Sequence, residues 1–287
     1  MRFRRISTLL LPFFLVLFTA TAAVAQKTAP QPLLDELMVK SGLWKQMDGL
    51  QSGVLAGIDE AQQSAKVPAS PATTARLKQV FSKAYAPDRM RADMREQLGS
   101  MLTVPEQREI LSFLKSNLGV RMTRLDEKYS DLAEYNKAAR AAPDHLKQLA
   151  PERIKRVQRM VQSLRADEGM ATIVINNQVA LISGISLAAP DAKPVDLDAL
   201  RRKMDAERSQ LVATISQQLT GLFAYMYREL SDADLDQFDA FANSAVGRKY
   251  HASAIEALDK VMVKASLAAG FELAGNRLKT ESKASRS

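Results

Sequence analysis

The stretch Phe113-Leu-Lys-Ser-Asn-Leu-Gly-Val-Arg121 has a counterpart further along the chain, Phe241-Ala-Asn-Ser-Ala-Val-Gly-Arg-Lys249. Both stretches have the spacing Phe-x-x-Ser-x-x-Gly. Each follows a Leu-Thr or Leu-Ser step by the same distance, at Leu102-Thr103 and at Leu230-Ser231. A pattern that recurs in the same local setting indicates a duplicated unit. We therefore predict two tandem, similar halves.

The residue types of the motif favour a structural role. An aromatic side chain anchors in a core, and a serine caps a new helical turn or bonds back to the preceding one. Glycine inside a helix costs about 1 kcal/mol relative to alanine, so its reuse predicts a kink or a close helix crossing. The alternative is that the motif lines a groove for a partner. Six residues carry these two hypotheses: Phe113, Ser116, Gly119, Phe241, Ser244 and Gly247.

The composition predicts an all-α fold. Helix-forming residues are abundant, while glycine amounts to 12 residues and aromatic side chains to 6%. Apolar residues recur at steps of three and four, which places them on one face of a helix. Thr103 is an expected N-cap with Glu106 in its first turn, and Asp196 or Asp198 is another. The pattern predicts helices over 31–63, 72–85, 87–102, 105–140, 196–229 and 232–271.

The apolar stretch 170–189 carries no charge and invites comparison with a membrane span. Asn176, Asn177 and Gln178 lie in its middle, where each would cost free energy in hydrocarbon. Its apolar positions also match those of the first helix when Gly42 is aligned with Gly169. We therefore expect a buried core helix. The β-branched run at 173–175 leaves a strand as the alternative.

The N-terminus has the features of a secretory signal peptide. Arg2, Arg4 and Arg5 precede an apolar stretch at 9–18, and a small-x-small site ends at Ala25. This apolar stretch is shorter than the roughly 20 residues of a membrane span. We expect a signal peptide at 1–25, a helical repeat at 26–140, a linker at 141–152, a second repeat at 153–272 and a disordered tail at 273–287.

The formal net charge of +8 arises in part from this signal peptide, which contains three arginines and no acidic residue. The densest basic run of the remaining chain lies on a predicted amphipathic helix. Such a helix can contact an anionic membrane, or it can be an ordinary surface helix of a bundle. Aromatic residues suited to base stacking are not interleaved with it, so we expect no nucleic-acid binding. The run comprises Arg153, Lys155, Arg156 and Arg159.

The two motif stretches resemble a bacterial family of exported proteins, domain-of-unknown-function family 2059. Its pattern is an aromatic residue, then serine, then glycine followed by a basic residue. The stretch 241–249 fits it well, whereas the first copy has Val120 at the basic position. Asn117 and Ala245 stand where many members have proline, so we expect the helix to continue through the serine. The resemblance implies a helical fold and no established activity or catalytic residues.

No constellation of catalytic residues is evident. The chain has no cysteine and only two histidines, His145 in the expected linker and His251 on an expected helix surface. No zinc-ligand spacing or phosphate-binding loop occurs. Ser112 and Lys115 match the S-x-x-K pattern of wall-active serine acyltransferases, but the accompanying elements are missing. We predict no catalytic residue, no metal and no cofactor, with a cell-wall hydrolase as the remotest alternative.

These observations favour an exported, non-enzymatic helical protein of the bacterial envelope, periplasmic or secreted, that acts as a binding or assembly module. Its expected partner is an unknown envelope protein or lipid. We expect no transmembrane span in the mature chain and allow a peripheral contact with anionic membrane. The alternative is a periplasmic carrier of lipid or another apolar ligand, since methionine adapts to varied ligand shapes. That alternative depends on Met90, Met94, Met101, Met160 and Met170, which core packing would equally explain.

Overall fold

The computed structural model describes residues 31–188 and 195–284, with side chains from 32 to 275. The predicted signal peptide, the prolines at 190 and 194 and the last three residues lie outside the described residues. Helices account for all the regular structure in the described part of the chain, so the fold is all-α and 173–175 is helical. The helices are α1 (Gln31–Lys40), α2 (Leu43–Ser64), α3 (Pro71–Ala84), α4 (Pro87–Met101), α5 (Val104–Leu114), α6 (Asn117–Tyr129), α7 (Leu132–Lys147), α8 (Pro151–Ser163), α9 (Ala166–Ala188), α10 (Leu197–Ala206), α11 (Arg208–Met226), α12 (Asp232–Ala242) and α13 (Ala245–Ala284).

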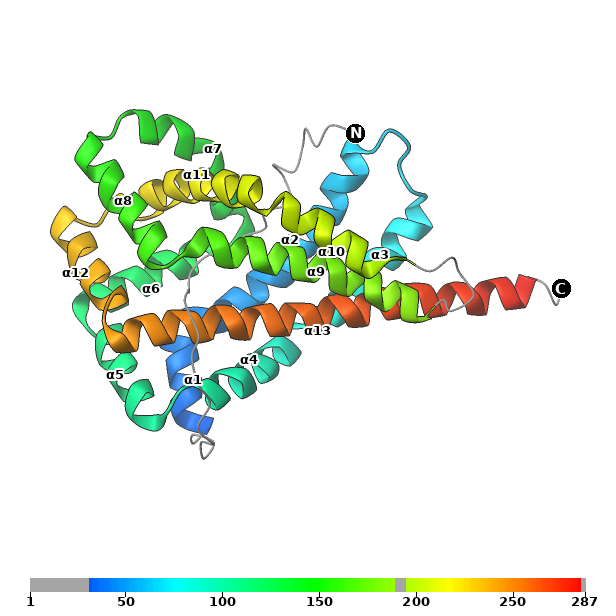
Figure 1. The fold of residues 1–287 in the computed structure, drawn as a ribbon, viewed down its shortest axis with the longest axis horizontal. Helices are drawn as coiled ribbons and strands as arrows, with labels where there is room; N and C mark the ends of the chain where they lie inside the picture. The colour runs from blue at the N-terminus through cyan, green and yellow to red at the C-terminus, as the bar shows by residue number, and fades with distance from the viewer. Residues whose placement is uncertain (1–30, 189–194, 285–287) are drawn as a thin grey trace.

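Helices α9 and α13 run side by side and in the same direction through the middle of the molecule (Figure 1). They approach closely because each supplies a glycine at the crossing. A Cβ atom on Gly184 would overlap the carbonyl oxygen of Leu267, and one on Gly270 would overlap that of Leu181. Neither helix could carry a larger residue there without moving away from the other.

The asparagines of α9 find partners on the neighbouring helices. Asn176 donates to Asp259 Oδ2 over 2.8 Å, and Asn177 accepts from Ser266 Oγ over 2.6 Å. The Ser266 hydroxyl also bonds that of Tyr85 over 2.6 Å. By length and composition α9 could cross a membrane, and about a third of its most apolar segment is buried in the protein. The side chains of Asn176 and Asn177 are thus hydrogen-bonded inside the bundle, as polar groups in a packed helix should be.

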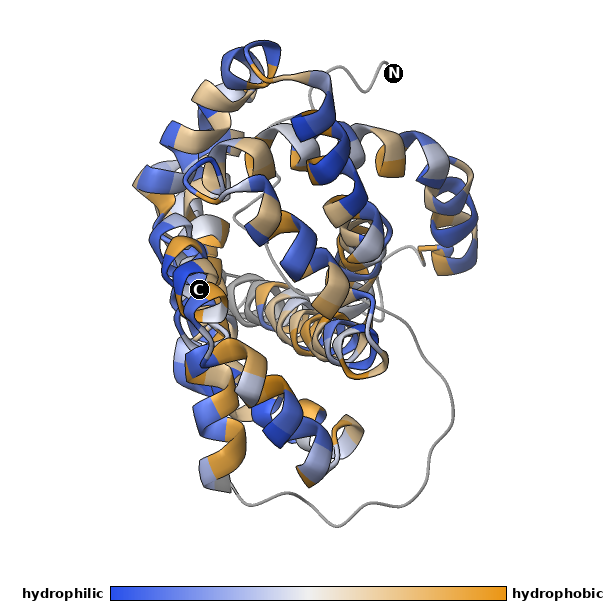
Figure 2. Ribbon diagram, turned by 90° about the vertical axis from the view of Figure 1, so that its left-hand side faces the viewer, coloured by the Kyte–Doolittle hydropathy of each residue, from blue (hydrophilic) through white to orange (hydrophobic). Residues whose placement is uncertain are grey.

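The helices form two hydrophobic cores, and each core combines helices from both of the predicted ranges. The first core is formed mainly by residues of α6, α8, α9, α11 and α12; its central side chains include Leu125, Met160 and Phe223. The second core is formed by residues of α1 to α5 and of α13, with Met94 and Val261 among its buried residues. Seen along the bundle, the helices carry apolar and polar stripes, as amphipathic helices do (Figure 2). The cores therefore do not coincide with the residue ranges 26–140 and 153–272.

At each of the two motifs the chain passes from one core to the other. At the same points the structure breaks both helices that we predicted to be continuous. The helix expected over 105–140 is divided into α5, α6 and α7, and the one over 232–271 into α12 and α13. Ser116 starts α6 and Ser244 starts α13, because each accepts a hydrogen bond from the backbone N–H three residues on. The further break before α7 is capped by Asp131. A serine at an N-cap starts a new helix without the proline that we considered necessary.

Other predicted boundaries also shift. The expected linker at 141–152 is mostly helical, since α7 continues past Pro143, whose side chain is exposed, to Lys147. Helix α13 continues to Ala284 through the expected disordered tail, which consists largely of good helix formers. Gly42 has the left-handed φ of 77°, but its proposed equivalent Gly169 lies inside α9, and the left-handed residue there is Arg165 with φ 42°.

The predicted helix starts at Thr103 and Asp196 are confirmed. Thr103 caps α5 in a capping box with Glu106, and Asp196 accepts from the backbone N–H of Ala199 at the start of α10. Ser231 and Asp234 form the corresponding box at α12. Helices α5 and α12, each of which precedes one copy of the motif, thus begin with the same local hydrogen bonds.

Candidate functional site

The motif residues meet where the two cores join. The rings of Phe113 and Phe241 stack with centroids 3.8 Å apart and planes 2° from parallel, and both rings pack against both cores. Gly119 and Gly247 lie close to the carbonyl oxygens of these phenylalanines, with no room for a Cβ atom. Together with the capping serines, the six motif residues form two tight corners whose apolar sides face each other.

The ion pairs at this junction are reciprocal. Lys249 on α13 binds the capping-box acid of α5, with Nζ 2.6 Å from Glu106 Oε1. Arg121 on α6 binds the capping-box acid of α12, with Nη1 3.0 Å from Asp234 Oδ2. The hydrogen bond from Arg121 lowers the pKa of Asp234 to about 2. Burial opposes ionisation of Glu106, but hydrogen bonds from Lys249 and Thr103 outweigh it and lower the pKa.

A small cavity of about 30 Å³ adjoins the junction and is bordered by Phe113, Gly119 and His251. His251 is only 3% exposed, so its predicted place on a helix surface is wrong. The error arose because α13 packs against both cores and has no fully solvated side at this level. Neither ring nitrogen has a hydrogen-bond partner among the described residues, and burial lowers the pKa of His251 to about 3. The cavity has room for about one water molecule, not for a substrate.

Asp126 borders the same cavity and is 7% exposed. Burial raises its pKa to about 8, although a hydrogen bond from the Tyr227 hydroxyl, 2.5 Å away, acts in the opposite direction. This carboxyl group is therefore largely protonated at neutral pH. The cavity thus holds a neutral carboxyl group and an imidazole without a partner among the described residues, and it has room for about one water. These buried polar groups lower the stability of the core, and the cavity is too small to admit a ligand.

The basic run on α8 faces acidic residues of α12. Arg153 Nη1 lies 2.7 Å from Asp232 Oδ1, and Arg156 binds both Asp232 and Asp236, at 3.1 and 3.2 Å. The other two cations of the run are paired as well, Arg159 with Asp236 at 3.3 Å and Lys155 with Glu152 at 2.9 Å. These intramolecular ion pairs give the basic residues of α8 a structural role that involves no membrane. Contact of this helix with an anionic surface stays a prediction.

The S-x-x-K pattern does not form an activated nucleophile. Ser112 is exposed on α5, and Lys115 Nζ lies 2.5 Å from Glu36 Oε1. The lysine amine is thus held by a carboxylate of α1 in an ion pair. In the described part of the chain, no group of three or more acidic or histidine side chains is arranged to hold a metal. His145 lies on α7 against the ring of Tyr225, with centroids 5.6 Å apart.

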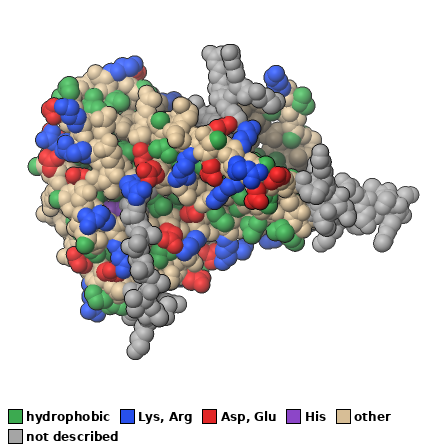
Figure 3. All heavy atoms as spheres, in the orientation of Figure 1, with side chains coloured by type: hydrophobic (Ala, Val, Ile, Leu, Met, Phe, Trp, Pro, Cys, Tyr) green, Lys and Arg blue, Asp and Glu red, His purple; other side chains and the backbone are tan. Residues whose placement is uncertain are grey.

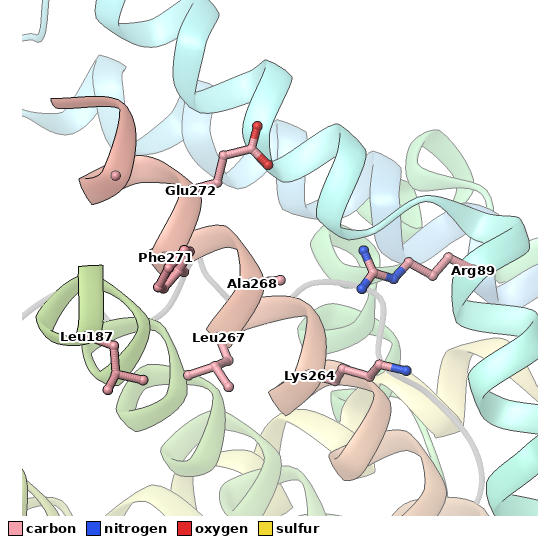
Figure 4. A pocket seen from close by; sticks show the side chains of 8 residues that line it. Arg89, Leu187, Lys264, Leu267, Ala268, Phe271 and Glu272 are labelled. Atoms are coloured by element: carbon pink, nitrogen blue, oxygen red, sulfur yellow. The ribbon is translucent and has the colours of Figure 1, made fainter. Parts of the chain in front are cut away.

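The candidate functional site is a groove between α4 and the far ends of α9 and α13. Its volume is about 670 Å³, within the usual range of ligand sites. Leu187 on α9 and Leu267 and Phe271 on α13 are 66%, 37% and 55% exposed, and they lie together on one side of the groove (Figure 4). These three large side chains form a solvent-exposed apolar surface at the end of the helix pair. We call this feature the α4/α9/α13 groove.

Charged side chains border the apolar surface. Lys264 pairs with Asp93 over 2.7 Å, and Glu272 pairs with Lys83 over 3.0 Å. Arg89, in the first turn of α4, extends toward α13 (Figure 4), and no ion pair or hydrogen bond of its side chain is found among the described residues. Within the described part of the chain, Arg89 is thus a cation of the groove that is not paired with a carboxylate.

Elsewhere the surface charges are mixed. On the face in Figure 3, basic and acidic side chains are interspersed without a large area of one sign. Of the methionines proposed for a carrier, Met90, Met94, Met160 and Met170 are 5% exposed or less, and Met101 is partly buried against the second core. They are packing residues in the protein as it stands, so an apolar ligand would have to bind somewhere else.

Sequence reasoning missed the groove. It treated 170–189 as buried throughout, and Leu187 lies at its end, beyond the close contact at Gly184. Phe271 ended the helix predicted over 232–271, next to a tail expected to be disordered. A signal did exist, because Leu187 and Phe271 are large apolar residues at the last turns of predicted elements. Only the parallel packing of α9 and α13 brings them together.

No family model matches this sequence, and comparison with curated proteins and with solved structures finds no match.

Proposed function

We propose that this chain is an exported, non-enzymatic binding or assembly module of the bacterial envelope that contacts its partner through the α4/α9/α13 groove. The observation that carries the proposal is the exposed apolar surface of Leu187, Leu267 and Phe271. Contiguous exposed apolar side chains rimmed by polar ones mark interaction sites in soluble proteins. The signal-peptide pattern at 1–25 supports export, and the resemblance to family 2059 supports a bacterial envelope protein made of two tandem copies.

The test is capture of an envelope component by the purified protein. Extract is passed over immobilised protein, and the retained material is identified by mass spectrometry. Replacing Leu187 and Phe271 together with asparagine should abolish retention of a component that the wild type binds. Val120→Asn is the matched control, because Val120 is 52% exposed on α6, away from the groove. Capture that survives the double substitution contradicts the groove, and catalytic turnover abolished by a point change contradicts the non-enzymatic role.

A periplasmic carrier is the second candidate, and the size of the groove favours it. A volume of about 670 Å³ with an apolar side could accommodate a ligand that moves with the protein. Native mass spectrometry after gentle purification distinguishes the two candidates. Co-purified lipid of defined mass supports the carrier, whereas a protein mass without adducts, together with a captured protein partner, supports the assembly module.

A further inference from the structure

We infer that the α4/α9/α13 groove binds a single-chain amphiphile with an anionic head group, the chain on Leu187, Leu267 and Phe271 and the head beside Arg89. This inference rests on the proposed function and adds the chemical class of the ligand. Both halves of such a molecule have a counterpart in the groove: an apolar side that α9 and α13 form, and a cation that projects from α4 (Figure 4).

The apolar half follows from exposure. Leu187, Leu267 and Phe271 leave much of their surface in water, and covering this surface with a hydrocarbon chain favours a complex. The close contact at Gly184 and Gly270 fixes the spacing of the two helices just before these residues. The apolar surface is therefore formed before any ligand arrives, which reduces the entropy lost on binding.

The charge of the head group follows from the pairing of the surrounding side chains. Lys264 pairs with Asp93 at 2.7 Å and Glu272 pairs with Lys83 at 3.0 Å. These paired side chains therefore favour neither an anionic nor a cationic head group. Arg89 is the cation with no such partner among the described residues. A guanidinium offers several N–H donors in a planar array that suits a carboxylate or a phosphate. A positively charged head group would be repelled at the same place.

The shape favours a single molecule over a membrane surface. A flat bilayer would contact the rim, because Arg89 and Lys264 project across the recess from different helices (Figure 4). A single chain can lie within the recess along α13 while its head reaches Arg89. Binding to vesicles alone is therefore an outcome that contradicts the inference.

The experiment compares three amphiphiles that share a dodecyl chain, each kept below its micelle concentration: dodecanoate, dodecyl maltoside and dodecyltrimethylammonium. Isothermal titration of the purified protein should show saturable one-to-one binding that is at least about tenfold tighter for dodecanoate than for the cationic compound. Equal affinity for the two charged compounds, or saturable binding of none, contradicts the inference. So does binding confined to vesicles that contain anionic lipid.

Two variants with matched controls localise the effect. Arg89→Gln should weaken dodecanoate binding by about tenfold and leave dodecyl maltoside unchanged, because it removes the charge and retains the apolar surface. Leu187→Asn should weaken both. The controls are Arg108→Gln, an exposed arginine of α5, and Val120→Asn on α6, which should bind as the wild type does. Unchanged thermal unfolding shows that each variant is folded.

The outcomes separate this inference from the proposed function. If no dodecyl compound binds but an envelope component is still captured through Leu187 and Phe271, the ligand class is wrong and the binding module stands. If neither binding nor groove-dependent capture occurs, both fail.

Discussion

The corner between α5 and α6 and the corner between α12 and α13 obey the same local rules but lead to different helices. In both, a capping box starts the first helix, a serine starts the second, and a glycine lets the backbone turn close to a phenylalanine carbonyl. After the first corner, α6 ends at Tyr129, whereas after the second α13 continues to Ala284. Equivalent positions also carry unlike side chains. The repeated motif therefore determines the geometry of the turn. The length of the following helix and the side chains on it depend on the core that this helix joins.

The largest effect is expected from the glycine that both corners share. Gly247→Ala and Gly119→Ala should each lower the free energy of unfolding by about 3 kcal/mol, since the added Cβ meets backbone that cannot move aside. Chemical denaturation measures this. Gly275→Ala on α13 is the control, because nothing lies within 4 Å of its Cβ position, and it should be neutral or stabilising by up to about 1 kcal/mol. Equal effects at Gly247 and Gly275 would refute the tight corner.

The next largest effect should come from Asp126 on α6, whose equivalent on α13 is the buried Ala254. The folded-state pKa of Asp126 is about 8, above the unfolded value of about 3.9, so folding retains a proton that the unfolded chain releases between these values. The contribution of this group to stability therefore falls as pH rises from about 4 to about 8. Asp126→Asn should stabilise the protein by at least about 2 kcal/mol at pH 8 and have little effect at pH 4. Parallel stability profiles of the two proteins would contradict this.

Thr123 and His251 lie at corresponding positions, seven residues after Ser116 and Ser244. Replacing these two side chains by apolar ones should change the free energy of unfolding in opposite directions. Thr123 donates to the carbonyl oxygen of Lys40 over 2.6 Å, whereas His251 is buried without a partner among the described residues. Replacing His251 with leucine should raise the free energy of unfolding by about 1 kcal/mol, and Thr123→Val should lower it by about as much.

The histidine also predicts a pH dependence. Its folded-state pKa of about 3 lies below the unfolded value of about 6.5, so the unfolded chain binds the extra proton. The protein accordingly loses stability as pH falls from about 6.5 toward 3, and His251→Leu should remove that part of the loss. A wild type and a variant that lose stability equally over this range would mean that the imidazole has a partner.

The smallest effect should come from the reciprocal ion pairs. Lys249→Met and Arg121→Met should each cost about 0.5 kcal/mol, because the lysine and arginine side chains are partly exposed. The two losses should be similar, and both should shrink in 1 M salt, where charges are screened beyond about 3 Å. Stability measured at low and high salt checks this. A loss that does not depend on salt would show that the aliphatic stems, not the charges, matter.

The sequence predicted local features well because they depend on neighbouring residues. The caps at Thr103 and Asp196 need only a side-chain oxygen and an N–H three residues away. The helical class follows from composition. The continuity of the helices through Ser116 and Ser244 was predicted wrongly, since the same serine can either cap a new helix or lie inside one. Which of these occurs depends on where the next helix finds its core.

The candidate groove and the place of His251 lay beyond sequence reasoning for a related reason. The periodicity of α13 shows which residues share a face, but two different cores and a parallel partner decide which faces are covered. Leu187 and Phe271 lie far apart in the chain and meet only because Gly184 and Gly270 let α9 and α13 touch. No pattern within either helix contains that information.

The helical class, the caps at Thr103 and Asp196 and the recurrence of one motif could be recognised in the sequence alone, because they depend on residue types and hydrogen bonds over a few residues. Only the tertiary structure decided that α6 and α13 enter opposite cores, that Asp126 and His251 are buried, and that an apolar groove stays open beside Arg89. The physical reason is that burial and its effect on ionisation depend on contacts between distant segments, and many such arrangements are compatible with the same local pattern.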